Sequence, residues 1–222
     1  MKIKLIFLFI FSFILKGTSQ PTKTVVTKNF KFNDGIYTTF TDLQRNKPTV
    51  YWDSLETNLA INPTTFFMQL EYLHFKRTKQ NVFADSIWGV VVDGIPYVRL
   101  SDKEVKKAGA YCFAGFILRG RICYFQYETI EKESVPITAY IPQTGEPYVT
   151  KNIVNNKSVV REKLFSFDTG EAINLTLSNF KRAIANDKDL LQTVADLKKE
   201  ELSEKLFKCL LIYNDRNPVF LK

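Results

Sequence analysis

Apolar and polar positions alternate in short runs through the first three quarters of the chain, which is typical of β-strands. The clearest run is "IWGVVVDGIPYVRL" at 87–100, where two β-branched segments flank Asp93-Gly94. Asp-Gly favours a type I′ turn, because both central residues of that turn have positive φ, so we predict a hairpin that pairs Val92 with Ile95. Both faces of the hairpin are mainly apolar, and we expect other parts of the fold to cover each face.

Pro96 constrains how this hairpin is placed in a sheet. It has no N–H to donate, and in the predicted register its nitrogen points away from the paired residue, Val91. A further strand on that side would lack one ladder hydrogen bond. We therefore predict that 95–100 is an edge strand or borders a β-bulge.

The same register aligns three large side chains on one face of the hairpin, those of Trp88, Tyr97 and Arg99. Ordinary burial tendencies favour a place in the core for the two aromatic residues. A partly exposed patch of these three residues, in contact with a ligand or a partner, is the functional alternative.

The remaining pattern predicts more strands and then helices. A capping box formed by Thr39 and Asp42 starts a short helix, and 64–77 is a strand. Further predicted elements are a hairpin over 111–127 turning at Arg119-Gly120, an extended stretch from Val135 to Asn152 with a turn at Thr144-Gly145, and a hairpin turning at Asp168 to Glu171. Helices follow, with Ser178 as a cap and a stripe of Leu202, Leu206 and Leu210.

Strands that precede helices favour the α+β class, here an antiparallel, hairpin-rich sheet followed by a C-terminal helical segment. The expected organisation is a signal peptide at 1–19, a β-rich domain at 20–176 and a helical segment at 177–222. We expect the helical segment to pack on the β-rich domain or to project from it.

The first twenty residues, "MKIKLIFLFIFSFILKGTSQ", have the three parts of a secretory signal peptide. Two lysines precede an apolar run from Leu5 to Leu15, and small residues follow before a cleavage site between Ser19 and Gln20. The apolar run is too short for a membrane-spanning helix, which needs about 20 residues. We predict an exported protein, periplasmic or at the outer envelope, with no transmembrane segment after the signal is removed.

The formal net charge is +8, and removal of residues 1–19 takes away three lysines and leaves +5. The remaining basic residues are scattered, with short clusters at 76–79, 106–107 and 198–199. Nucleic-acid binding would require a concentrated basic stripe with aromatic residues among it. We therefore predict a solvated, mildly basic surface and no nucleic-acid partner.

The three cysteines predict buried thiols. In the predicted hairpin Cys112 lies about 13 Å along the strand from the position opposite Cys123, beyond the ~7 Å between α-carbons that a disulfide allows. A bridge from either cysteine to Cys209 stays open. His74 is the only histidine, and no cysteine pair has ligand spacing, so we predict neither a metal site nor a cofactor.

Asp168-Thr169-Gly170 resembles the active-site triplet of aspartic proteases. That chemistry needs two carboxylates that share a proton, and this chain has one triplet, so a second chain would have to supply the other. A β-turn rich in turn-forming residues is the favoured interpretation. Ser178-Asn179-Phe180-Lys181 matches a Ser-x-x-Lys motif without its companion elements, and we assign no catalytic residue.

Three passages together resemble an uncharacterised family of small exported proteins of Gram-negative bacteria: "DGIYTTFTDLQRNKP", "IWGVVVDGIPYVRL", and "FDTGEAINLT" with the tail ending in "YNDRNP". The resemblance spans most of the mature chain. It implies an exported, β-rich protein and transfers no catalytic residue.

These observations predict an exported, non-enzymatic protein of the bacterial envelope that acts by binding or assembly, with an unknown protein or envelope component as its partner. Two alternatives stay open. One is an aspartic-type hydrolase that uses Asp168 as a homodimer. The other is a carrier of an apolar ligand, which would require a sizeable internal cavity.

Overall fold

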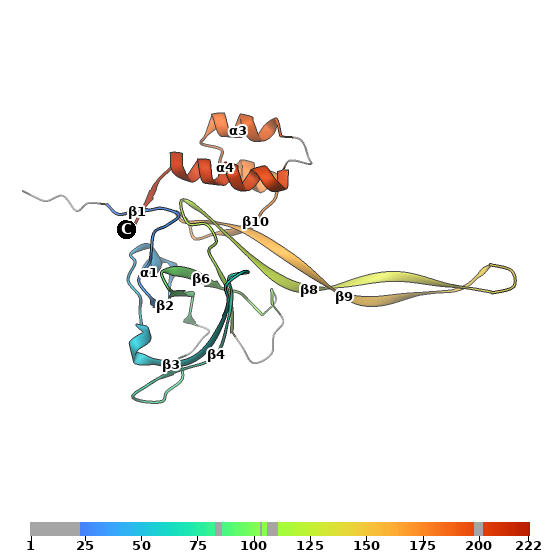
Figure 1. Cartoon of the computed structure of the whole chain (residues 1–222), viewed down its shortest axis with the longest axis horizontal. Helices are drawn as coiled ribbons and strands as arrows, with labels where there is room; N and C mark the ends of the chain where they lie inside the picture. Colours follow the sequence, from blue (N-terminus) through green and yellow to red (C-terminus); the bar gives the residue numbers. More distant parts are fainter. Residues whose placement is uncertain (1–22, 83–85, 103, 106–110, 198–201) are drawn as a thin grey trace, which may run out of the picture.

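A computed structural model describes residues 23–82, 86–102, 104–105, 111–197 and 202–222. These residues form three stacked layers: a six-stranded sheet, a three-stranded sheet and a layer of helices (Figure 1). The predicted signal peptide, with its cleavage site at Ser19 and Gln20, lies outside the described residues.

The six-stranded antiparallel sheet has the order β2-β5-β6-β7-β4-β3. Its strands are β2 (Gly35–Tyr37), β3 (Leu55–Asn62), β4 (Phe67–Phe75), β5 (Gly89–Val92), β6 (Ile95–Arg99) and β7 (Tyr111–Gly115). The second sheet has the order β10-β9-β8, with β8 (Ile122–Tyr140), β9 (Pro147–Ser166) and β10 (Ala172–Asn174). A two-stranded sheet pairs β1 (Val25–Val26) with β11 (Val219–Phe220).

Helices α2 (Leu177–Ala183), α3 (Lys188–Ala195) and α4 (Leu202–Arg216) form the third layer. A short helix, α1 (Phe40–Gln44), and a 3₁₀ turn, η1 (Trp52–Ser54), lie among the first strands. The protein is therefore mostly β, with antiparallel sheets and with helices near the C-terminus. The α+β class describes this layout, although strands dominate it.

The β5–β6 hairpin has the predicted register, with Val92 opposite Ile95 and Val91 opposite Pro96. Asp93 and Gly94 have φ values of 54° and 76°, as a type I′ turn requires. The predicted capping box is also present, since Thr39 accepts from the Asp42 amide and the Asp42 carboxylate accepts from the Thr39 amide.

The prediction that 95–100 is an edge strand or borders a β-bulge is wrong, because β6 lies between β5 and β7 and pairs with both without a register shift. Its ladder with β7 begins at Tyr97, one residue beyond Pro96. The Pro96 carbonyl accepts a hydrogen bond from the amide of Phe116 at 2.8 Å, so only a donor is missing at this position. Proline is tolerated in this interior strand because it stands where the second ladder has not yet begun.

The predicted 111–127 hairpin is also wrong, because β7 and β8 belong to different sheets. The chain bends between them, and Leu118 pairs with Tyr124 rather than with Arg121. This bend lies against α4: a Cβ at Gly120 would come within 2.5 Å of the Asn214 side chain. All three cysteines are nevertheless buried thiols, as predicted.

The first part of the β8–β9 ribbon, residues 122–127 and 161–166, is the middle layer of the molecule, and we call it the root of the ribbon. One of its faces, with Cys123, Phe125 and Phe165, packs in a cluster with Val91 and other residues of the six-stranded sheet. The opposite face, with Ile122, Tyr124 and Leu164, packs under α2, α3 and α4. A third cluster fills the far side of the six-stranded sheet, so both faces of the β5–β6 hairpin are covered, as predicted.

The residue that caps the first helix of the helical layer differs from the prediction. Thr176, not Ser178, caps α2, and its hydroxyl accepts a hydrogen bond from the Asn179 amide at 3.2 Å. The hairpin at 168–171 is confirmed, with Phe165 opposite Ala172. It leads directly from β9 into this cap.

Candidate functional site

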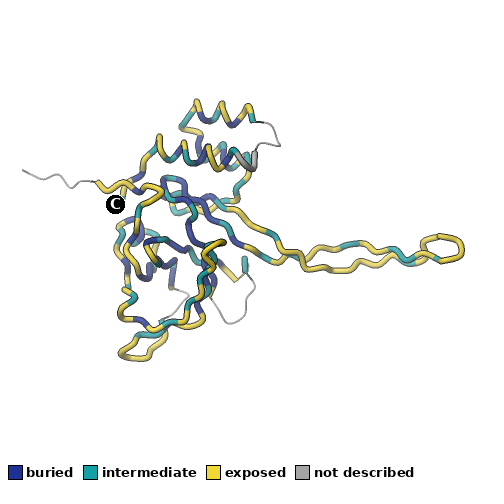
Figure 2. The backbone as a smooth tube through the Cα atoms, viewed as in Figure 1, coloured by how far each residue is buried: buried dark blue, intermediate teal, exposed yellow. Residues whose placement is uncertain are grey.

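The β8–β9 ribbon extends far beyond the three layers and is the feature that the sequence did not reveal (Figure 1). Its two strands pair continuously from Ile122 opposite Ser166 to Ala139 opposite Val149. Only the root is buried, whereas the part from Glu128 to Val160, here called the arm, is mostly exposed along its whole length (Figure 2).

Seven large apolar side chains on the arm are between 45% and 65% exposed. They are Ile130, Ile137, Tyr140, Tyr148, Ile153, Val154 and Val160. These side chains lie on both faces of the arm, and so many large apolar groups left in water on a projecting element are unusual for a monomeric surface.

The apolar residues of one arm face gather near the tip. Cross-strand pairs of Val135 with Ile153 and of Ala139 with Val149 flank Ile137, and we call these five residues the tip patch. The same face carries charged residues closer to the rest of the described molecule, which we call the body. There, Arg161 pairs with Glu131, and Lys157 pairs with Glu133 at 3.4 Å.

The two edges of the arm differ. The backbone N–H and C=O of Tyr124 bond to Leu118 on the side away from β9, so even-numbered residues of β8 point their backbone groups outward. Pro136 is one of these residues, and because proline has no N–H, the β8 edge lacks a hydrogen-bond donor at this position. The described part of the β9 edge contains no proline between Tyr148 and Val160.

An open groove of about 610 Å³ lies where the arm leaves the body. Phe67 and Gln69 of β4 line one side, and Ile130 and Val160 of the arm line the other. The groove joins the exposed arm to β4 of the six-stranded sheet.

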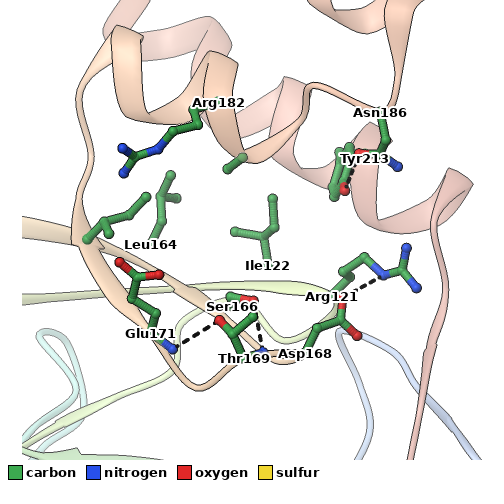
Figure 3. A pocket seen from close by; sticks show the side chains of 12 residues that line it. Arg121, Ile122, Leu164, Ser166, Asp168, Thr169, Glu171, Arg182, Asn186 and Tyr213 are labelled. Atoms are coloured by element: carbon green, nitrogen blue, oxygen red, sulfur yellow. Dashed lines mark hydrogen bonds and ion pairs between the residues drawn. The ribbon is translucent and has the colours of Figure 1, made fainter.

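A second groove, of about 600 Å³, lies between the helical layer and the β9–β10 turn (Figure 3). It contains Asp168, whose carboxylate Oδ2 lies 3.2 Å from Nε of Arg121. The Nε–H is not aligned on the carboxylate, so the contact is an ion pair and not a hydrogen bond. The aspartic-protease mechanism needs a second carboxylate at this place, and here the partner is a guanidinium.

Other polar groups of this groove serve the turn and the layer contact. Ser166 and Thr169 accept hydrogen bonds from backbone amides of the same turn. Tyr213 of α4 donates to Asn186 at 2.8 Å, and burial raises the pKa of its hydroxyl. The first two bonds lie within the turn, and the third joins α4 to the loop between α2 and α3. None of these hydroxyls is an activated nucleophile.

The structure does not bring the three predicted contact residues together. Trp88 is partly buried and packs against Phe40 and Phe165 in the cluster between the two sheets. Tyr97 is buried in the cluster on the far side, where its ring covers Gly115. Arg99 lies 5.2 Å from the ring centre of Tyr111.

The other candidate residues, Cys123 and His74, belong to the packed sheets. Burial raises the pKa of the Cys123 thiol to about 12, which keeps it protonated at neutral pH. His74 lies in β4 beside Tyr72, as expected for a strand residue. In the part of the chain that the structure describes, no group of three or more His, Cys, Asp or Glu side chains could hold a metal ion.

Comparison of the chain with protein-family models, with curated proteins and with solved structures finds no match. Among the described residues, no helix has both the length and the apolar character needed to cross a membrane.

The sequence contained one sign of the arm. The prediction of an extended stretch from Val135 to Asn152 with a turn at Thr144-Gly145 matches the outer half of the ribbon. Its projection from the body was missed, because strand alternation looks the same on a packed and on an unpacked ribbon.

Proposed function

We propose that this is an exported protein of the bacterial envelope that works by binding or assembly and not by catalysis. The arm, residues 128–160, is its partner-binding element. The observation that carries this proposal is the number of exposed apolar side chains, on both faces of an element that projects from a well-packed body.

Physical chemistry supports a partner on the arm. An isolated two-stranded ribbon is only marginally stable in water, because it buries little apolar surface. The three core clusters contain no residue of the arm, so packing in the body does not hold its outer part. A partner would supply the missing cover and offset the entropy of ordering a ribbon of this length.

The predicted signal peptide and the resemblance to exported proteins support a place in the periplasm or at the outer envelope. Asp168 supports a structural role because its carboxylate pairs with Arg121. The hydrolase and the apolar-ligand carrier stay predictions without a supporting observation.

Site-specific photo-crosslinking in cells tests this function. A photoreactive residue at Val154 or Val160 is expected to give a covalent adduct in the envelope fraction, because both side chains are exposed on β9 of the arm. The matched control is Tyr51, which is 56% exposed on the body and should give none. Equal yields from the arm and the body, or adducts from neither, would contradict the proposal.

A further inference from the structure

We infer that the partner of the arm is a second copy of this chain, paired through the outer edge of β9 about a twofold axis. This inference rests on the proposed function of the arm and specifies its occupant. The two β9 strands would run antiparallel and join two ribbons into one four-stranded sheet.

The β9 edge is open over a defined length. Next to the body it is occupied, since β10 pairs with Lys163 to Phe165 and the Leu175 amide donates to the Glu162 carbonyl. From Val160 outward to Pro147, no other strand pairs with it among the residues that the structure describes. The Glu162 bond shows that even-numbered residues of β9 direct their backbone groups outward, so this edge displays unpaired N–H and C=O groups.

The β9 edge is better suited to strand addition than the β8 edge. Every outward position from Thr150 to Ser158 keeps its N–H, whereas Pro136 interrupts the β8 edge. The outward N–H and C=O groups of β9 therefore form an uninterrupted row to which a further strand can pair, as in recognition by strand addition.

The length of the open edge limits the register of a twofold pair. The segment 147–160 has its midpoint between Ile153 and Val154, so full overlap centres the axis on one of these two residues. An axis at Val154 would set Lys151 directly opposite Lys157 of the other copy, and like charges in that position are destabilising. An axis at Ile153 sets Lys151 opposite Asn155 and avoids the clash.

Charge does not oppose this register. Three of the four basic residues on this face of β9 pair with carboxylates of their own chain, Lys157 with Glu133, Arg161 with Glu131 and Lys163 with Glu104. The strand from Pro147 to Val160 has no acidic residue, so an acidic peptide is the competing occupant, but it would bring no second tip patch beside the first.

The register centred on Ile153 also supplies an interface of ordinary strength. Within the regular part of the ladder it forms four hydrogen-bonded residue pairs between Thr150 and Asn156, with two hydrogen bonds each, about 8 in all. A typical protein interface has about 10. The axis brings Ile153 against Ile153 of the other copy and joins the two tip patches across one sheet face.

Two measurements on the purified protein, expressed from its full-length sequence, test the inference. Sedimentation analysis at tens of micromolar is expected to give twice the mass of the chain. Asn156→Pro should give the monomer, because residue 156 points its N–H outward and proline there removes a donor of the new ladder only. Asn156→Ala is the matched control and should stay dimeric, while circular dichroism confirms that both variants are folded.

Disulfide trapping tests the register. In the proposed pair the two Ile153 residues form a non-hydrogen-bonded pair with α-carbons about 4.5 Å apart, so I153C should cross-link a dimer upon oxidation. In V154C the two α-carbons would be about 8 Å apart and should not cross-link. Cross-linking of V154C without I153C would overturn the register.

A wild-type protein that stays monomeric would overturn the inference. If the arm nevertheless forms adducts with a different protein in cells, the proposed function stands and only its occupant is wrong. Absence of any adduct on the arm would contradict both the inference and the proposed function.

Discussion

At the scale of the residue, Glu104 links a loop to the root of the arm. Its carboxylate accepts hydrogen bonds from the Ser101 amide and hydroxyl at 2.9 Å and from the Tyr127 hydroxyl at 3.0 Å. Its own carbonyl accepts from the Thr129 hydroxyl. Burial alone would raise the pKa of the carboxyl, but these donors and the nearby Lys163 outweigh burial and lower it.

The lowered pKa predicts a pH-dependent contribution to stability. A carboxyl with a lowered folded-state pKa stabilises the fold above its ordinary pKa of 4.5, and this contribution is lost as the pH falls through the lower folded-state value. Glu104→Gln should therefore reduce the free energy of unfolding by about 1 kcal/mol at pH 7 and by almost nothing near pH 2. Denaturant titrations at both pH values measure the difference.

The control for this prediction is Glu146→Gln at the tip of the arm, which should change stability at neither pH. An equal loss at both pH values in Glu104→Gln would show that its carboxylate charge contributes nothing.

At the scale of the element, Asn214 connects α4 to the start of β8. Its amide nitrogen donates to the Ile122 carbonyl at 2.8 Å, and its amide oxygen accepts from the Ile122 N–H at 2.9 Å. The side chain thus replaces a β-strand neighbour at the point where the chain leaves β7. This contact explains why the predicted hairpin at Arg119-Gly120 does not form, since its position in the strand is taken by a helix residue 92 positions away.

Loss of this connection is expected to loosen the helical layer. Asn214→Ala leaves the N–H and C=O of the buried Ile122 without their side-chain partner, and we expect a loss of about 2 kcal/mol in the free energy of unfolding. Asp215→Ala, at an exposed neighbour on the same helix, should stay within about 0.5 kcal/mol of the wild type. Equal stabilities of the two variants in urea titrations would contradict the role of Asn214.

At the scale of the whole molecule, the body and the arm have different sources of stability. The three core clusters hold the layers together, and each includes residues from distant parts of the chain. The arm depends on its own cross-strand pairs, among them the ion pairs of Glu131 and Glu133. The body should therefore fold without the arm.

Shortening the arm tests this division. Replacement of residues 130–158 by Asn-Gly would join Thr129 to its cross-strand neighbour Val159 by a two-residue turn. The shortened protein should melt within about 4 °C of the wild type, a shift that corresponds to about 1 kcal/mol, and should be monomeric. A shortened protein that does not fold would show that the arm stabilises the body.

The sequence by itself determined the local features that depend on adjacent residues alone. The type I′ turn at Asp93-Gly94 and the capping box of Thr39 and Asp42 follow from chemistry between neighbouring residues, and the structure has both. The tertiary structure alone decided which strands share a sheet, why Pro96 lies in an interior strand, and that the β8–β9 ribbon projects. Those outcomes depend on contacts between residues far apart in the chain, and alternation within one segment carries no information about what that segment packs against.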